Sequence, residues 1–169
     1  MTVVHFALFA LFPIGMAYAA VSDLLTMTIS NRLVLALLAA FVLAIPFSGM
    51  DFNTVGLHLA TGGVVLVVAF AFFAFGWIGG GDAKLAAVAA LWIGWESALP
   101  FVAYASVIGG ILTFLLLAFR ARMLPAFALR QEWVMRLHDP KVGVPYGVAL
   151  AAAALIVYPH TSWMQLGVA

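Results

Sequence analysis

Long apolar runs alternate with short polar breaks along the whole chain. The runs cover residues 3–21, 33–47, 55–75, 83–95, 98–119 and 144–158. A helix needs about 20 apolar residues to cross a hydrocarbon core of about 30 Å, and several runs reach or approach that length. Because a helix pairs its own backbone groups inside lipid, the pattern predicts six membrane-spanning helices. No repeat or soluble second unit is evident, so we predict one all-α, polytopic membrane domain over residues 1–169.

Composition supports this reading and excludes several functions. Hydrophobic residues make up 67% of the 169 positions and charged residues 8%, which is too apolar for a soluble domain. The chain has no cysteine, so disulfides, thiolate nucleophiles and cysteine-bound metals are excluded. The four histidines lie far apart in sequence, and we expect neither a metal nor a cofactor. We expect the chain to lie in a lipid bilayer and to bind no nucleic acid.

The basic residues predict the topology. If all six runs cross, the first, third and fifth breaks share one side of the membrane, and both termini lie on the other. All seven basic residues fall in those three breaks: Arg32, Lys84, Arg120, Arg122, Arg130, Arg136 and Lys141. The positive-inside rule makes that side cytoplasmic and places both termini on the non-cytoplasmic side. In the alternative topology, residues 76–95 form a re-entrant hairpin. This would divide the basic residues between the two membrane faces, so the charge bias argues against it. A cleaved signal peptide is disfavoured because "MTVVHF" contains no basic residue.

Two of the six acidic residues lie at the ends of apolar runs. Asp23 follows the first run and Asp82 precedes the fourth, whereas the others lie in polar breaks, where we expect solvated charges: Asp51, Glu96, Glu132 and Asp139. An ionisable residue at the membrane edge is costly and suggests a function. Two carboxylates on one membrane face could meet as a pair in which repulsion keeps one protonated, and such a pair can activate water against an amide. The alternative is that each residue only borders a helix.

The helix dipoles suggest how this pair divides its roles. Asp23 closes a helix, at the end that disfavours negative charge, and Asp82 opens one, at the end that favours it. We therefore predict that Asp23 more often carries the shared proton and that Asp82 more often acts as the base.

A glycine run marks the second acidic residue. Gly79, Gly80 and Gly81 precede Asp82, and Lys84 follows it. The 14 residues from 82 to 95 span only about 21 Å as a helix, so we predict that the glycine backbone is irregular and buried at membrane depth. Glycine accepts positive φ and lets another backbone approach closely, as an active-site loop requires. Small-residue helix packing or a simple turn is the alternative.

The long basic break over residues 120–141 has a mixed composition. Over residues 125–137, apolar and charged side chains interleave in a way that suits a helix lying in the membrane interface. The basic residues there could bind anionic lipid or an acidic segment of a partner, or they could only set the topology.

Three segments resemble one family. "GGGDAKL" contains Gly79-Gly80-Gly81-Asp82 and matches the GxGD motif of the intramembrane aspartic proteases. "SDLLTMTISNR" resembles the segment of the type IV prepilin peptidases in which the first catalytic aspartate, here Asp23, is followed by Ile-Pro-Asn, here Ile29-Ser30-Asn31. "VPYGVAL", residues 144–150, is similar to the final span of the short members that serve tight-adherence (Flp) pili.

This resemblance implies a function. Asp23 and Asp82 would form a catalytic dyad shaped by the glycine loop, and the enzyme would remove the leader of prepilin or pseudopilin substrates at the cytoplasmic face of the bacterial inner membrane. Ser30 stands where the family often has proline. The chain lacks the cysteine-bearing insertion of larger members, so we expect no methylation of the product. The alternatives are a proton-coupled transporter or channel, or a non-catalytic component of pilus assembly. The nearly unbroken apolar residues 112–118 and 148–157 disfavour a proton relay across the membrane.

Overall fold

A computed structural model describes residues 3–125 and 128–166, and within these ranges it contains helices and no strand. This confirms the all-α class. The helices are α1 (Val3–Thr26), α2 (Asn31–Ser48), α3 (Phe52–Ala74), α4 (Gly80–Ile93), α5 (Trp95–Arg120), α6 (Glu132–His138), α7 (Tyr146–Val157) and α8 (Ser162–Leu166). Single 3₁₀ turns lie at Ala128–Arg130 and Tyr158–His160. Each of the six predicted runs forms a helix.

Four of these helices are long and apolar enough to cross a membrane: Phe9–Thr26, Asn31–Ser48, Phe52–Ala74 and Trp95–Arg120. The protein is therefore a multi-pass membrane protein. Helices α4 and α7 have only 14 and 12 residues. Six full crossings, and the side on which the termini lie, stay predictions.

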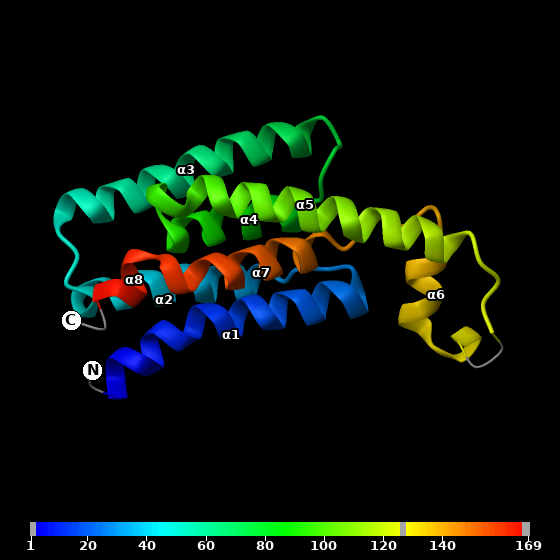
Figure 1. Cartoon of the computed structure of the whole chain (residues 1–169), viewed down its shortest axis with the longest axis horizontal. Coiled ribbons are helices and arrows are strands. Elements are labelled where there is room, and N and C mark those ends of the chain that lie inside the picture. Colours follow the sequence, from blue (N-terminus) through cyan, green and yellow to red (C-terminus); the bar gives the residue numbers. More distant parts are fainter. Residues whose placement is uncertain (1–2, 126–127, 167–169) are drawn as a thin grey trace.

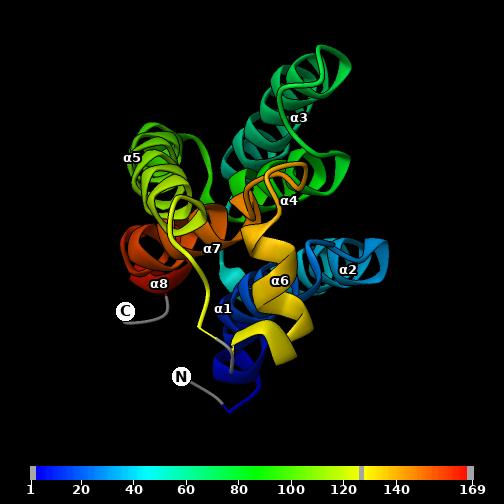
Figure 2. The same cartoon turned by 90° about the vertical axis from the view of Figure 1, so that its right-hand side faces the viewer.

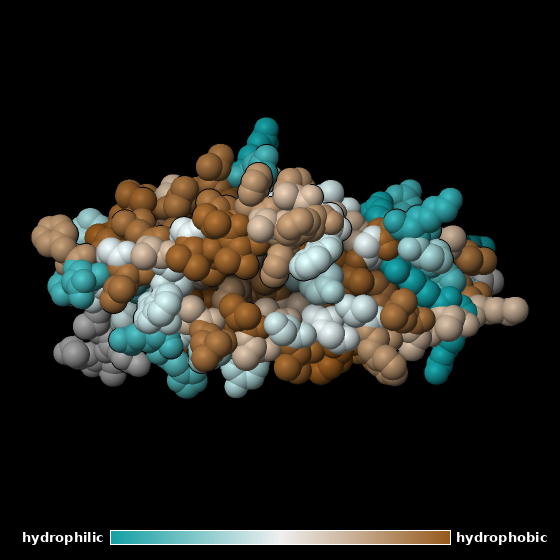
Figure 3. All heavy atoms as spheres, turned by 90° about the horizontal axis from the view of Figure 1, so that it is seen from above, coloured by the Kyte–Doolittle hydropathy of each residue, from teal (hydrophilic) through white to brown (hydrophobic). Residues whose placement is uncertain are grey.

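The long helices run side by side along one axis of the molecule (Figure 1). The start of α1 and helix α8 lie at one end of this bundle, and α6 lies at the other, across the bundle axis. Helix α6 is shorter than the amphipathic segment predicted for residues 125–137, and residues 126 and 127 lie outside the described ranges. Seen from above, apolar side chains cover the middle of the molecule, and hydrophilic ones gather at the end that carries α6 (Figure 3).

Helix α4 forms the centre of the bundle. It packs against α2, α3, α5 and α7, and every residue from 87 to 93 is buried. Because neighbouring helices surround it, α4 is shielded from lipid although it is short.

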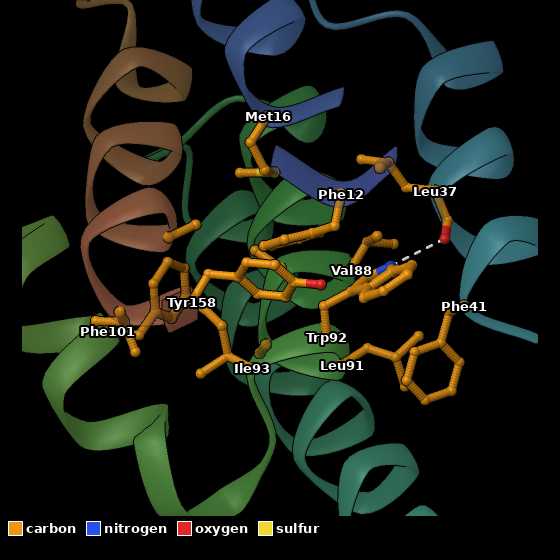
Figure 4. Close-up of a cluster of buried hydrophobic side chains, with 14 of the residues drawn as sticks. Phe12, Met16, Leu37, Phe41, Val88, Leu91, Trp92, Ile93, Phe101 and Tyr158 are labelled. Atoms are coloured by element: carbon orange, nitrogen blue, oxygen red, sulfur yellow. Dashed lines mark hydrogen bonds between the residues drawn. The ribbon is translucent and has the colours of Figure 1, made fainter. Parts of the chain in front are cut away.

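An aromatic cluster fills the interior of the bundle near the C-terminal end of α4, away from Asp82 (Figure 4). Its centre is Trp92, whose indole N–H donates to the Leu37 carbonyl at 3.0 Å. The Trp163 indole of α8 in turn donates to the Trp92 carbonyl at 2.7 Å, and His58 Nδ1 lies 2.7 Å from the Leu91 carbonyl oxygen. Each of these buried polar groups has a partner, so this part of the bundle is closed by packing and hydrogen bonds.

Candidate active site

Asp23 lies in the last turn of α1 and is almost completely buried, with 4% of its surface exposed. Its Oδ2 atom accepts a hydrogen bond of 2.7 Å from the backbone N–H of Gly147. Gly147 lies in the first turn of α7, where backbone N–H groups have no partner within their own helix. The N-terminus of α7 therefore offers its positive end to the Asp23 carboxylate.

Asp82 lies in the first turn of α4 and is half-buried. Its carboxylate is close enough to Asp23 for like-charge repulsion between them, and it also interacts with the backbone amides of Gly79 and Gly147. The two predicted acids therefore come together from α1 and α4, beside the start of α7. Helix α7 packs against both of these helices, as the view along the bundle from the α6 end also indicates (Figure 2).

The hydrogen bond from Gly147 changes what the helix dipoles predict for the charge on Asp23. Asp23 does close α1, as predicted, but it also faces the N-terminus of α7, which favours negative charge. The dipole of α1 alone thus gives an incomplete account of this carboxylate. Which of the two acids holds the shared proton stays a prediction.

Ile29, in the short connection between α1 and α2, fills the space between the two glycine segments. A Cβ atom added at Gly81 would lie 3.2 Å from Ile29 Cβ, and one added at Gly147 would lie 2.8 Å from Ile29 Cδ1. Both distances are shorter than ordinary carbon–carbon contacts of about 3.5–4.0 Å. A side chain at Gly81 or Gly147 would therefore crowd Ile29, and glycine at both positions lets these segments approach closely.

The glycine run before Asp82 differs from the prediction in its backbone. Helix α4 already begins at Gly80, and Gly79 is its N-cap, with φ −71° and an exposed surface. The prediction of an irregular glycine backbone is therefore wrong at Gly80 and Gly81, since helical hydrogen bonding starts two residues before Asp82. The location of the glycines at membrane depth stays a prediction. Positive φ occurs in this segment at Gly76 (φ 73°) and not at the three motif glycines.

Side chains approach these glycines closely, whereas the approach of another backbone, the other predicted use of these glycines, stays a prediction. A Cβ atom at Gly79 would lie 3.0 Å from Asp82 Oδ2, and one at Gly80 would lie 3.2 Å from the Phe73 ring. The missing side chains leave space for the carboxylate and for the end of α3.

Lys84 does not contact either carboxylate through a hydrogen bond in the described structure. Lys84 is exposed, and its Nζ atom donates to Asn31 Oδ1 at 3.0 Å. Asn31 is the first residue of α2, and Ser30 caps that helix by accepting the Arg32 N–H at 3.2 Å. Ser30 thus supplies the N-cap of α2, and Lys84 connects the two motif segments to each other.

The other four acidic residues are exposed, as predicted. Asp51 caps α3 by accepting the Thr54 N–H at 3.0 Å, and hydrogen bonds from Thr54 hold the pKa of Asp51 below its ordinary value. Asp139 accepts the Lys141 N–H at 2.9 Å. Across residues 3–125 and 128–166, no three His, Cys, Asp or Glu side chains are grouped as ligands for a metal ion.

Arg120, at the end of α5, was not singled out from the sequence beyond its charge. Its guanidinium donates to three backbone carbonyls, at 2.7 to 2.9 Å, and these belong to Leu137, Val142 and Gly143. The same segment leads directly into α7 and the Gly147 donor. Arg120 therefore holds the chain that positions the backbone N–H at Asp23. The segment "VPYGVAL" indicated this region, but no sequence feature indicated a backbone donor within it.

Comparison with known proteins identifies one family. A family model described as the type IV leader peptidase family matches residues 10–114, which include both aspartates and the glycine run but not α7. No curated protein and no solved structure is detectably similar to the chain.

Proposed function

The chain belongs to the type IV leader peptidase family, and we propose that it is a membrane-embedded aspartic endopeptidase that removes the leader of prepilin-like substrates. One observation carries this proposal: two carboxylates from different helices, Asp23 and Asp82, lie within reach of one backbone donor, Gly147. A leader peptidase is a hydrolase, and paired carboxylates can perform amide hydrolysis without a metal or cofactor.

In the proposed reaction, the ionised carboxylate takes a proton from a water molecule, whose oxygen bonds to the carbonyl carbon of the scissile peptide. The protonated carboxyl group donates its proton to the carbonyl oxygen. When the tetrahedral intermediate collapses, the carbon–nitrogen bond breaks, and the carboxyl group that took the water proton donates it to the leaving nitrogen. One hydroxyl of the intermediate gives its proton to the other carboxylate, so the new acid is released and the dyad again holds one proton. Repulsion between Asp23 and Asp82 supports the required state with a single shared proton.

We further propose that cleavage occurs at the cytoplasmic face of the bacterial inner membrane and serves tight-adherence (Flp) pili. The basic residues support this side, because they surround the end of the bundle that carries Asp23 and Asp82. The chain has no cysteine, and α1 and α2 are connected by residues 27–30 alone. We therefore propose peptidase activity without methylation of the new N-terminus.

Co-expression with a tight-adherence prepilin tests the proposal. The wild-type enzyme should shorten the prepilin by its leader on an immunoblot, and Asp23→Asn and Asp82→Asn should each abolish this change. Asp139→Asn is the matched control, since Asp139 is an exposed carboxylate on the same side of the molecule, and it should process normally. Processing by either dyad variant would contradict the peptidase proposal. A proton flux that depends on both aspartates, without processing, would favour a transporter.

A further inference from the structure

An apolar cavity opens beside the Asp82 carboxylate. Its volume is about 400 Å³, and it lies between α3, α4, α5 and α7. Its polar lining residues are Asp82, Ser106 and Tyr146. The Ser106 hydroxyl donates to the Val102 carbonyl at 2.8 Å, and the Tyr146 hydroxyl lies 3.4 Å from Thr113 Oγ1. Both hydroxyls are thus engaged within the protein, and the cavity is an apolar space that ends at a carboxylate.

The shape of the cavity follows from the helices around it. Its α3 wall extends from Val64 to Phe72, a distance of about 12 Å at 1.5 Å per residue. That length equals roughly two helical turns, or three to four residues of extended chain at about 3.3 Å each. Small side chains leave room along the walls: Ala69, Ala86, Ala105 and Ala149. Figure 3 looks onto the α3 and α5 side of the bundle, where apolar side chains surround a depression.

We propose that this cavity binds the apolar segment of the substrate next to the cleaved bond, with the leader at the Asp82 end. This inference rests on the proposed peptidase function and adds the place and the direction of substrate binding. Phe72 and Asp82 lie near the end of α3 and the start of α4, whereas Phe101 lies near the start of α5, so the cavity extends from the acids towards the middle of the bundle. An apolar segment that follows the cavity therefore enters the hydrocarbon core, and the polar leader stays outside it.

A peptide fits this cavity better than a lipid chain because of the carboxylate at its end. An acyl chain next to Asp82 would desolvate the carboxylate and offer it no hydrogen-bond donor, which is costly. A peptide backbone carries an N–H at each non-proline residue and can satisfy that oxygen. Asp82, one of the two paired acids, lines the cavity, so a segment bound there brings its neighbouring peptide bond next to this carboxylate.

Cross-linking provides a direct test, because the chain has no cysteine of its own. Ser106→Cys is placed in an Asp23→Asn background, which keeps the prepilin uncleaved, and the prepilin carries one cysteine in its apolar segment. A short bis-maleimide added to membranes should join the two proteins. Val107→Cys is the matched control, because Val107 is exposed on the same helix, lies about 100° further around it, and does not line the cavity. Equal cross-linking at both positions, or none at Ser106→Cys, would overturn the inference.

Kinetics separate this inference from the proposed function. Ser106→Phe fills the cavity and should raise KM for prepilin roughly tenfold or more while kcat changes little, whereas Val107→Phe should leave both unchanged. If the wild-type enzyme does not cleave prepilin, the peptidase proposal fails, and the cross-link still reports on the cavity. If the wild-type enzyme cleaves and Ser106→Phe leaves KM unchanged, substrate binding in the cavity is refuted while the peptidase proposal stands.

Discussion

Substitution of Gly147 by alanine tests the donor that faces the aspartates. The new Cβ atom would lie 2.8 Å from Asp23 Oδ2, 2.8 Å from Ile29 Cδ1 and 3.1 Å from Asp23 Cβ. Ordinary contacts between carbon atoms are about 3.5–4.0 Å, so Asp23, Ile29 or the start of α7 has to move by several tenths of an ångström. Since the hydrogen bond from Gly147 to Asp23 is only 2.7 Å long, this movement lengthens or breaks it.

The cost follows from the kind of hydrogen bond that is lost. A hydrogen bond to a charged group contributes about 1.5–3 kcal/mol. Each 1.36 kcal/mol of lost transition-state stabilisation lowers the rate about tenfold, so kcat/KM for prepilin cleavage should fall about 10- to 150-fold. The fall should appear in kcat, because the substrate cavity along α3 and α5 keeps its lining.

The assay is prepilin cleavage by purified enzyme in proteoliposomes, with thermal unfolding measured on the same samples. Gly143→Ala is the matched control, since it changes the same connecting segment four residues earlier and its Cβ atom would have no atom within 4 Å. The control should cleave at the wild-type rate. A folded Gly147→Ala enzyme whose kcat/KM stays within about twofold of wild type would refute the role assigned to this donor.

Three further outcomes follow from the contacts around the site. Arg120→Ala should lower the free energy of unfolding by about 2 kcal/mol and reduce cleavage, measured by chemical denaturation and by immunoblot, because three carbonyls lose their donor; Arg120→Lys should restore only part of this effect. Lys84→Ala and Asn31→Ala should each lower kcat/KM a few-fold, and the double variant should lower it no further, since both remove the same 3.0 Å hydrogen bond; additive losses would contradict this. Gly94→Ala should destabilise the fold by about 2 kcal/mol or more in the same denaturation experiment, because Gly94 has φ 77° and a Cβ atom there would lie 2.7 Å from the His58 ring.

The sequence predicted the helices and the two acids because their physical signatures are local. An apolar run predicts a helix regardless of its neighbours, and a carboxylate at the end of such a run is unusual by itself. Asp23 at the end of α1 and Asp82 at the start of α4 are therefore found where the pattern indicated. That the two acids meet needed knowledge of how α1 and α4 pack. The predicted topology placed both acids on one membrane face, where they could meet, and the family resemblance implied that they do.

The residues that the sequence did not reveal act through their backbone or over long distances. Gly147 contributes an N–H group that every non-proline residue has, so its identity indicates close approach and not donation. Arg120 resembles the other basic residues of its loop until its guanidinium is seen to hold carbonyls up to 23 residues away. The glycine run led to a wrong prediction of its backbone, because three consecutive glycines suggest positive φ. Here Gly80 and Gly81 instead start a helix and allow close packing.

The two short helices explain why both acids lie where helix N-termini can reach them. At 1.5 Å per residue, α4 and α7 measure about 21 Å and 18 Å, less than the hydrocarbon core of about 30 Å. Neither helix can therefore have both of its ends at a membrane surface. Where such a helix ends inside the membrane, neighbouring helices must cover the backbone at that end. The aromatic cluster around Trp92 and Trp163 lies away from the acids and is closed by its own hydrogen bonds. The N-termini of α4 and α7 therefore lie beside Asp82 and Asp23. A helix N-terminus stabilises a carboxylate best where water solvates that carboxylate poorly.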